Sequence, residues 1–363
     1  MSFQRVVCVM ALLGVMLPHR AALAQAIEDA VIASMAATHE ELPTITLKED
    51  AEDLVSTFAM TSDGRLMASI SRWSQEPATH EIVFYSPEGE TLETWDMTEK
   101  MPPRRNWYKG KLPVMLHGSA EGDIYVGGAG WLMRFNAAGD LLQELDYREM
   151  LAEAAQAEHA RKSQQDQSED PPPGALAFNR VVPAGITSSA AYLFVALHMD
   201  GGGTRSNQDV YRFSRELGEP LRIIENLRGC CAHIDLETLD NDKLVVAENT
   251  RFRVNTYTFA GTLLGRWGKR SRTSIEGFAS CCNPVGICFA PDGELITASS
   301  GVGRVKRYTP EGEFLGMVAL VNVTRWEGAI PGKCYIPIEV SPDNQRVYVL
   351  DEVTQNIHVM QRR

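Results

Sequence analysis

The chain has 363 residues, of which 44% are hydrophobic and 23% are charged, and its 47 acidic and 35 basic residues give a formal net charge of −12. This excess of acidic residues argues against nucleic acids and anionic membranes as partners, because both require a basic surface. The length would accommodate two average domains, but closed all-β folds often use as many residues for a single domain.

Residues 1–24 have the pattern of a secretory signal peptide. Arg5 precedes an apolar run from Val6 to Leu17, and Ala22-Leu23-Ala24 supplies the small residues that signal peptidase recognises. The run is shorter than the ~20 apolar residues needed to span a bilayer, and no later stretch of the sequence reaches that length. We therefore expect a periplasmic or secreted protein without a membrane span in the mature chain.

A sequence unit recurs six times after this segment. Each copy contains an apolar strand, a tight turn, a second apolar strand, a third strand, and a glycine turn before a fourth strand. The clearest copies span 232–268 and 284–320, and weaker copies begin near Leu54, Val114, Pro183 and Ile336. Four strands in about 40 to 50 residues match one blade of a β-propeller. The sequence therefore predicts an all-β, six-bladed β-propeller of four-stranded antiparallel blades.

The sixth copy ends after three strands, so its outer strand must come from elsewhere. Residues 44–48 precede the first blade, alternate apolar with polar side chains, and predict the strand that completes the last blade. Such a closure joins the two chain ends and removes open sheet edges. We expect an N-terminal segment at 25–42 and a propeller over 43–363. A helical and linker insert at 148–174 separates blades two and three, and its polar, proline-containing composition predicts a solvated surface excursion.

Two segments carry a family resemblance. VVAENTRFRVNTYTFAGTLLGRWG and ITASSGVGRVKRYTPEGEFLG resemble NHL repeats, a family of six-bladed β-propeller units, over about residues 232–320. The resemblance implies the fold. It implies no particular activity, because propellers serve as enzymes, binding modules and scaffolds alike.

Three cysteines occupy equivalent positions in consecutive repeats. Cys231, Cys282 and Cys334 each lie 13 residues before the second strand of their blade. In a propeller, the start of each innermost strand and the end of each second strand lie on one face, because the two strands form an antiparallel hairpin. We therefore expect these cysteines at the mouth of the central channel on that face.

A metal site or a redox-active thiol site is one interpretation of this pattern. Further cysteines directly precede two of the three, and a histidine follows Cys231 by two residues, which places it on the same side of an extended strand. Thiolates and imidazole suit zinc, copper or an iron–sulfur cluster. The candidate ligands are Cys230, Cys231, His233, Cys281, Cys282 and Cys334.

Disulfide bonds are the competing interpretation. Six cysteines remain after removal of the signal peptide, and an even number in an oxidising compartment is typical of disulfides. Bonds between Cys230 and Cys281, or between Cys231 and Cys282, would connect neighbouring blades. The function would then be that of a disulfide-stabilised scaffold for a protein or glycan. Cys288 lies within an inner strand, where a buried, unreactive thiol is expected.

Other polar and aromatic residues are expected in loops on the same face. They could bind calcium, or act as acid and base in a divalent-ion-dependent hydrolase or lyase of the six-bladed type, although a solvated loop position explains the histidines more simply. The tryptophans could form a platform for a ligand or pack over the blade ends. These candidates are His80, His198, Asp200, Asn249, Arg251, Asp351, Glu352, Trp73, Trp107 and Trp326.

Several catalytic motifs are absent from the sequence. It contains no Gly-x-Ser-x-Gly, His-Glu-x-x-His, Cys-x-x-Cys-His or Walker pattern, which excludes an α/β-hydrolase, a zincin, a c-type haem protein and a P-loop NTPase. Whether the protein is an enzyme stays open at this stage. We expect a monomer that binds a protein or a small molecule on its loop face.

Overall fold

The structure is a computed structural model that describes residues 37–47, 50–101, 114–128, 130–153, 156, 181–198, 205–230, 233–271, 274–279, 282–300, 303–321, 336–351 and 354–363. The signal peptide expected at 1–24 and most of the insert expected at 148–174 lie outside these residues. Within them, no helix is both long enough and apolar enough to cross a membrane.

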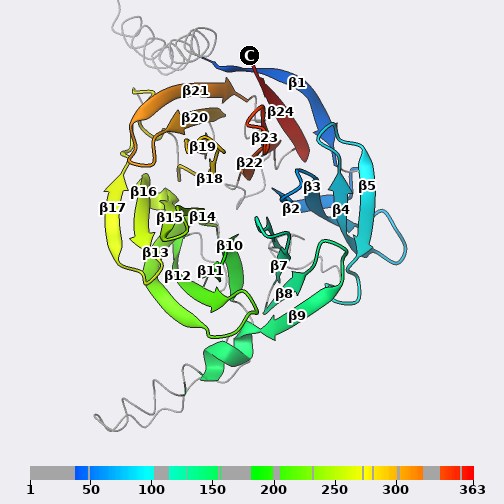
Figure 1. The fold of residues 1–363 in the computed structure, drawn as a ribbon. Helices are drawn as coiled ribbons and strands as arrows, with labels where there is room; N and C mark the ends of the chain where they lie inside the picture. Colours follow the sequence, from blue (N-terminus) through cyan, green and yellow to red (C-terminus); the bar gives the residue numbers. More distant parts are fainter. Residues whose placement is uncertain are drawn as a thin grey trace, which may run out of the picture.

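Six antiparallel sheets of four strands surround a central axis (Figure 1). Blade one comprises β2 (Leu54–Met60), β3 (Leu66–Arg72), β4 (Thr79–Tyr85) and β5 (Thr91–Asp96). Blade two comprises β6 (Met115–Gly118), β7 (Ile124–Gly128), β8 (Trp131–Phe135) and β9 (Leu141–Asp146). Blade three comprises β10 (Val182–Ser188), β11 (Tyr192–His198), β12 (Arg205–Ser214) and β13 (Leu221–Cys230).

The remaining blades follow the same order from the axis outward. Blade four comprises β14 (Asp235–Leu239), β15 (Lys243–Glu248), β16 (Arg253–Thr258) and β17 (Leu263–Trp267), with the short 3-10 helix η2 (Asn249–Arg251) after β15. Blade five comprises β18 (Gly286–Phe289), β19 (Leu295–Ser299), β20 (Arg304–Tyr308) and β21 (Phe314–Leu320). Blade six comprises β22 (Ile338–Val340), β23 (Arg346–Asp351), β24 (Asn356–Arg362) and the N-terminal β1 (His39–Thr46). The predicted six-bladed architecture is confirmed.

The N-terminal strand closes the ring, as the sequence predicted. β1 pairs antiparallel with β24 from His39 opposite Arg362 to Thr46 opposite Asn356, with a register irregularity between Leu42 and Ile45. The strand begins five residues earlier than the predicted segment 44–48. The sequence pattern did not predict the first half of β1. Its acidic side chains face solvent, so it shows no alternation of apolar and polar residues, and it is held by backbone pairing.

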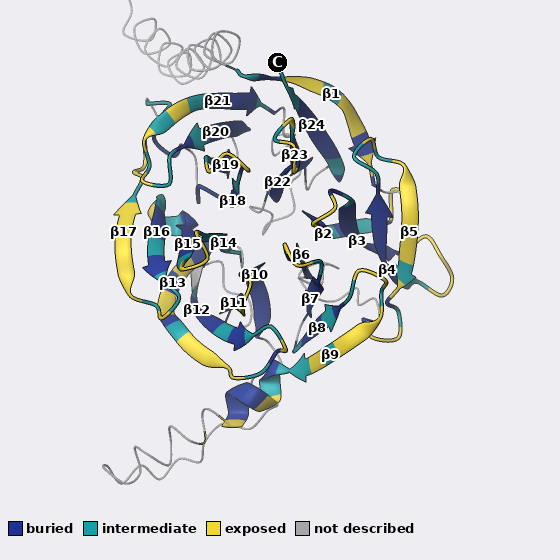
Figure 2. Cartoon of the chain, viewed as in Figure 1, coloured by how far each residue is buried: buried dark blue, intermediate teal, exposed yellow. Residues whose placement is uncertain are grey.

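The hydrophobic core consists of six clusters, each formed by the facing sides of two neighbouring blades. Figure 2 shows the consequence, because the inner and middle strands are buried while the outer strands carry most of the exposed residues. A sheet buried on both faces needs apolar side chains on both faces, which explains the near-continuous apolar runs of second strands such as β11, where Leu193–Leu197 are all apolar and buried.

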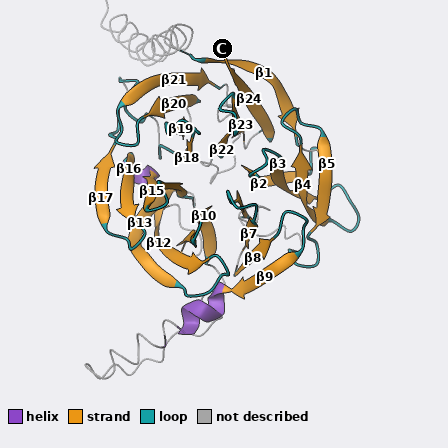
Figure 3. Ribbon diagram, viewed as in Figure 1, coloured by secondary structure: helices purple, strands orange, loops and turns teal. Residues whose placement is uncertain are grey.

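The start of the insert between blades two and three is helical over 147–153 (Figure 3). Tyr147, Met150 and Leu151 are buried in the core cluster between these two blades. The Tyr147 hydroxyl accepts a hydrogen bond from the Gly130 amide at 2.6 Å. Tyr147 directly precedes the predicted insert, but Met150 and Leu151 belong to it, so its first part is packed in the core rather than solvated.

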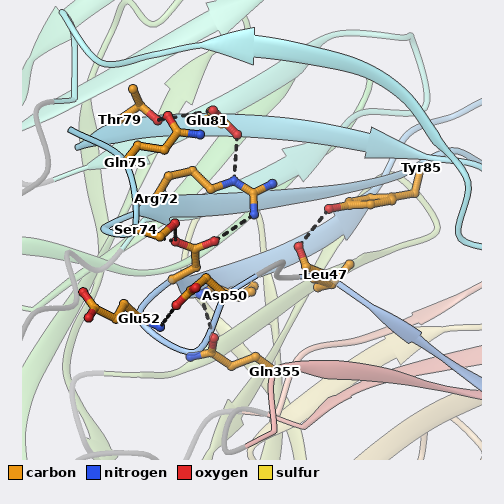
Figure 4. A network of polar contacts seen from close by, with 12 residues as sticks. Leu47, Asp50, Glu52, Arg72, Ser74, Gln75, Thr79, Glu81, Tyr85 and Gln355 are labelled. Carbon is orange, nitrogen blue, oxygen red and sulfur yellow. Dashed lines mark hydrogen bonds and ion pairs between the residues drawn. The ribbon is translucent and has the colours of Figure 1, made fainter. Parts of the chain in front are cut away.

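A buried ionic network lies at one end of blade one (Figure 4). Arg72 donates from Nη1 to Asp53 at 3.1 Å and from Nε to Glu81 at 3.0 Å, and Asp53 is fully buried. The Ser74 hydroxyl also donates to Asp53 at 2.8 Å. These bonds to its charged form outweigh the effect of burial and hold the pKa of Asp53 below its usual value.

Hydrogen bonds near this network connect the two ends of the chain. The Val55 amide of blade one donates to the Gln355 side chain of blade six at 3.3 Å, and the Tyr85 hydroxyl donates to the Leu47 carbonyl at 3.1 Å (Figure 4). The closure therefore rests on polar contacts between blades as well as on the pairing of β1.

Candidate functional site in the central channel

The innermost strands of all six blades surround the axis, and their register places one residue of each blade at the same depth. This depth is defined by the residue of the second strand with which the inner-strand residue pairs. Glu237 of β14 pairs with Val245 of β15, and Cys288 of β18 pairs with the equivalent Ile296 of β19. The level consists of Ala59, His117, Thr187, Glu237, Cys288 and Glu339. Four of the six blades therefore contribute a titratable side chain at one depth of the channel.

A third carboxyl group lies one step along the same strand as Glu237. Asp235 precedes it by two residues in β14, so both side chains lie on the same side of the strand. Asp235, Glu237 and Glu339 are each partly buried. The site thus combines three carboxyl groups from blades four and six, a thiol from blade five and an imidazole from blade two.

These carboxyl groups titrate far from their ordinary range. Burial raises the pKa of Asp235 to about 7, and burial together with the charge of Asp235 raises that of Glu339 to about 8. Burial and the charges of the other two carboxyls raise the pKa of Glu237 well above its usual value. No Lys or Arg of the described chain forms an ion pair with any of the three. At neutral pH the site therefore holds protons that exposed carboxyls would have lost.

The thiol of Cys288 lies among these groups. It is buried, and its pKa is raised well above the usual value by burial and by the charges of Glu237 and Glu339. The charges of Glu237 in blade four and Glu339 in blade six therefore both act on the thiol of blade five, which also packs in the hydrophobic cluster between blades five and six. The expectation of a buried, unreactive thiol agrees with this environment.

The same side chains also connect neighbouring inner strands. Asp235 accepts a hydrogen bond from the Ile287 amide of blade five at 2.7 Å, and Glu339 accepts one from the Met60 amide of blade one. His117 Nε2 lies 2.8 Å from the Ser188 hydroxyl of blade three, and burial lowers the pKa of this histidine to about 4. A structural role accounts for these contacts, but it does not require three carboxyl groups that have no cationic partner among the residues that the structure describes.

Three of the residues predicted from sequence are brought together at the end of β13. The Cys230 amide donates to Asn249 Oδ1 at 2.9 Å, and the His233 amide donates to the Cys230 carbonyl at 3.1 Å. Asn249 Nδ2 in turn donates to the His233 carbonyl at 3.1 Å. Cys230 thus ends the outer strand of blade three, in a turn fixed by Asn249 of blade four. Cys282 is buried in the equivalent connection between blades four and five.

The other described candidates lie at separate places. His80 and His198 are fully buried in β4 and β11, not in solvated loops, because these strands extend further than the sequence pattern suggested. His80 is within hydrogen-bond distance of the Ser69 hydroxyl, at 2.9 Å. Asp351 is buried at the end of β23, while Arg251 is half-exposed and pairs with Glu248 at 3.2 Å. Trp73 lies in the connection between β3 and β4.

Seven candidates lie outside the described residues, so their arrangement stays a prediction. They are Cys231, Cys281, Cys334, Asp200, Glu352, Trp107 and Trp326. In the part of the chain that is described, no three side chains of His, Cys, Asp or Glu come together as a metal ion would need. We therefore assign no step of the chemistry to a divalent ion or a cluster.

Sequence reasoning missed Asp235, Glu237, Glu339 and His117. The sequence did contain a signal for the two glutamates. Glu237 and Cys288 are 51 residues apart, and so are Cys288 and Glu339, so the three occupy the same position of the repeat. Polar residues at the inward positions of otherwise apolar strands are the pattern that could have identified the channel site.

Comparison with known proteins finds similarity only to solved structures. No protein family model and no curated protein matches the chain. A virginiamycin B lyase from Staphylococcus aureus, solved with quinupristin, is 14% identical with a TM-score of 0.49, over 89% of this chain and 98% of the lyase. A gluconolactonase from Xanthomonas campestris is 12% identical with a TM-score of 0.49, over 91% of this chain and 98% of that chain. The calcium-binding protein regucalcin from Agrobacterium tumefaciens is 12% identical with a TM-score of 0.49, over 90% of this chain and 95% of that chain. Likeness at this level assigns no activity.

Proposed function

We propose that the protein binds a small molecule in its central channel and that Asp235, Glu237 and Glu339 exchange protons with it. The observation that carries this proposal is the group of three partly buried carboxyls with raised pKa values and no cationic partner among the described residues. Strongly shifted carboxyls in a cavity are typical of acid and base groups. The reaction class that fits is a hydrolase or a lyase.

The pKa values of Asp235 and Glu339 both lie close to neutral pH. A group is most effective in proton transfer when its pKa is close to the working pH. Asp235, with a pKa of about 7, and Glu339, with a pKa of about 8, are therefore both suited to exchange protons with a ligand near neutral pH. A ligand that is cationic or rich in hydrogen-bond donors would replace the protons and favour the ionised carboxyls.

Infrared titration tests the proton content directly and requires no substrate. Glu339→Gln should remove a protonated carboxyl band from the spectrum at neutral pH, whereas Glu311→Gln, in an exposed turn, should leave that band unchanged. Activity can then be screened on lactones and peptidyl lactones. Turnover that survives both Asp235→Asn and Glu339→Gln, or a spectrum without the protonated band, would contradict the proposal.

A second candidate function is metal binding or redox chemistry at the cysteine-bearing turn. It is supported by Gln208, which is fully buried and has no hydrogen-bond partner for either amide atom. The Gln208 amide lies against Gly229, where an added Cβ would come within 2.1 Å of Nε2, directly beside Cys230. Buried amides are normally satisfied by protein, water or an ion. The ligand set would also require Cys231, Cys281, Cys282 and Cys334, with zinc, copper or an iron–sulfur cluster as the metal.

Element analysis and thiol titration of the purified protein test this second candidate. Stoichiometric zinc, copper or iron in the native protein would support it if Cys230→Ser lowers the metal content and Cys288→Ser leaves it unchanged. Cys288 serves as the control because it belongs to the channel. Protein without metal and without titratable thiols after denaturation would favour the disulfide-stabilised scaffold.

Export to the periplasm or the medium belongs to the same proposal. It is supported by the signal-peptide pattern of residues 1–24. N-terminal sequencing of the protein from a bacterial periplasm should begin near residue 25, and recovery of the uncleaved chain from the cytoplasm would contradict it.

A further inference from the structure

A cavity of about 330 Å³ lies at the outer edge of the propeller, between blades one and two. Its lining includes the aromatic rings of Trp95 in β5 and Phe135 in β8, and the side chain of Met97. This volume is at the lower end of the ~300–1,000 Å³ range of ligand pockets, so it suits a single small group. The cavity shares no residue with the channel site.

Trp95, which lines the cavity, is fixed by contacts within blade one and with blade two. Trp95 Nε1 donates to Glu93 at 2.8 Å, and its ring contacts Phe84 and Phe135 at centroid distances of 4.6 and 5.5 Å. Trp267 has the equivalent position in blade four, but its Nε1 donates to the Pro310 carbonyl of the neighbouring blade at 3.0 Å. Both rings reach the glycine turn of the next blade, since an added Cβ on Gly139 would lie 3.0 Å from Trp95 and one on Gly312 would lie 2.3 Å from Trp267.

The charges around the aromatic wall are mainly negative. Asp96 and Glu99 line the cavity, and the Lys100 ammonium that shares the lining pairs with Glu144 of blade two at 3.4 Å. Hydrogen bonds from the hydroxyl and the amide of Thr98 lower the pKa of Asp96, which keeps this carboxylate ionised. The two acidic groups of the lining therefore face solvent, while its only lysine is partly neutralised.

We infer that this cavity is a binding site for a small organic cation with an alkylated ammonium group. Aromatic rings attract such cations through their π faces, and tryptophan is the most effective of them. The methyl groups of the cation fit the apolar part of the wall, and Asp96 and Glu99 supply the opposite charge at its edge. A divalent metal fits poorly, because aromatic and thioether groups are not its ligands.

Choline and its neutral isostere 3,3-dimethylbutanol form the matched pair of probes, measured by ligand-observed NMR titration of the full chain. Choline should bind in the millimolar range, and the isostere should bind several-fold more weakly, since only the charge differs. Trp95→Leu should weaken choline binding about fivefold, whereas Trp267→Leu, at the equivalent position of blade four, should leave it unchanged.

Two exposed substitutions test the charges without disturbing the core. Asp96→Asn should weaken choline binding about threefold, and Lys100→Gln should strengthen it by a similar factor, because it removes the only positive charge of the lining. Equal binding of the two probes, absence of choline binding, or an affinity indifferent to both substitutions would each overturn the inference. Thermal unfolding of every variant shows whether an altered affinity comes from a folded protein.

Discussion

Replacing Glu339 by glutamine should change how the stability of the protein depends on pH. The pKa of Glu339 is raised from 4.5 to about 8, so the folded state keeps a proton that the unfolded chain loses once the pH exceeds 4.5. The folded state therefore binds more protons in this window, and the free energy of unfolding falls as the pH rises from 4.5 to about 8. The stabilising contribution is complete below pH 4.5 and lost above pH 8.

The size of the effect follows from about 1.4 kcal/mol for each unit of pKa shift. The full shift would correspond to roughly 4 to 5 kcal/mol, but water reaches part of the Glu339 side chain, so we expect roughly 1 to 3 kcal/mol. Glutamine keeps the acceptor for the Met60 amide and does not ionise. Glu339→Gln should therefore match the native protein at acidic pH and exceed its stability at pH 8.

Urea unfolding at a series of pH values measures this difference. Glu311→Gln is the matched control, because it removes an acidic group from an exposed turn. The reasoning is refuted if Glu339→Gln and the native protein show the same slope of unfolding free energy against pH.

Three further predictions concern the thiol, the ionic network and the closure. Cys288 should react with a thiol reagent only after denaturation, because its pKa is raised and its side chain is buried; peptide mapping that finds it labelled in the native protein would disprove this. Arg72→Met should cost about 3 to 5 kcal/mol in urea unfolding by leaving Asp53 buried and unpaired, and adding Asp53→Asn should recover most of the loss. Ile45→Ala should cost about 2 to 4 kcal/mol through the cavity it leaves in β1, whereas Leu92→Ala, 53% exposed on β5, should stay within about 0.5 kcal/mol of the native protein.

The sequence predicts the architecture well because the blades repeat one local pattern. Each hairpin has its own turn signal, as in the Asp63-Gly64 turn, where Gly64 has a φ of +85°. Apolar runs between such turns are long enough to define the strands, and six copies allow a weak match to be checked against a strong one. The first half of β1 lacks these signals, because its position depends on the edge that β24 presents.

The candidate site is harder to predict because it depends on the closing of the ring. Cysteines attract attention in a sequence through their chemistry, but only Cys230, Cys282 and Cys288 fall among the described residues, and Cys230 ends an outer strand. Asp235 and Glu237 are ordinary acidic residues in a strand until the neighbouring blades bury them. Burial raises the pKa of both, and the charges of Asp235 and Glu339 raise that of Glu237 further, which are properties of the assembled channel.

The position of the carboxyls within the repeat separates a functional role from a structural one. A role confined to connecting the blades would be served by any polar side chain that reaches the next inner strand, as the hydroxyl of Thr238 does when it donates to the Ser188 carbonyl at 2.9 Å. Blades four and six instead place carboxyls at the same depth as the buried thiol of blade five, where the charges of Asp235 and Glu339 raise the pKa of Glu237 and the charge of Asp235 raises that of Glu339. This arrangement costs stability at neutral pH, as the expected gain in Glu339→Gln would show. Ligand binding in the channel, as we propose it, would explain why the chain keeps these acids although an amide at position 339 would remove part of this cost.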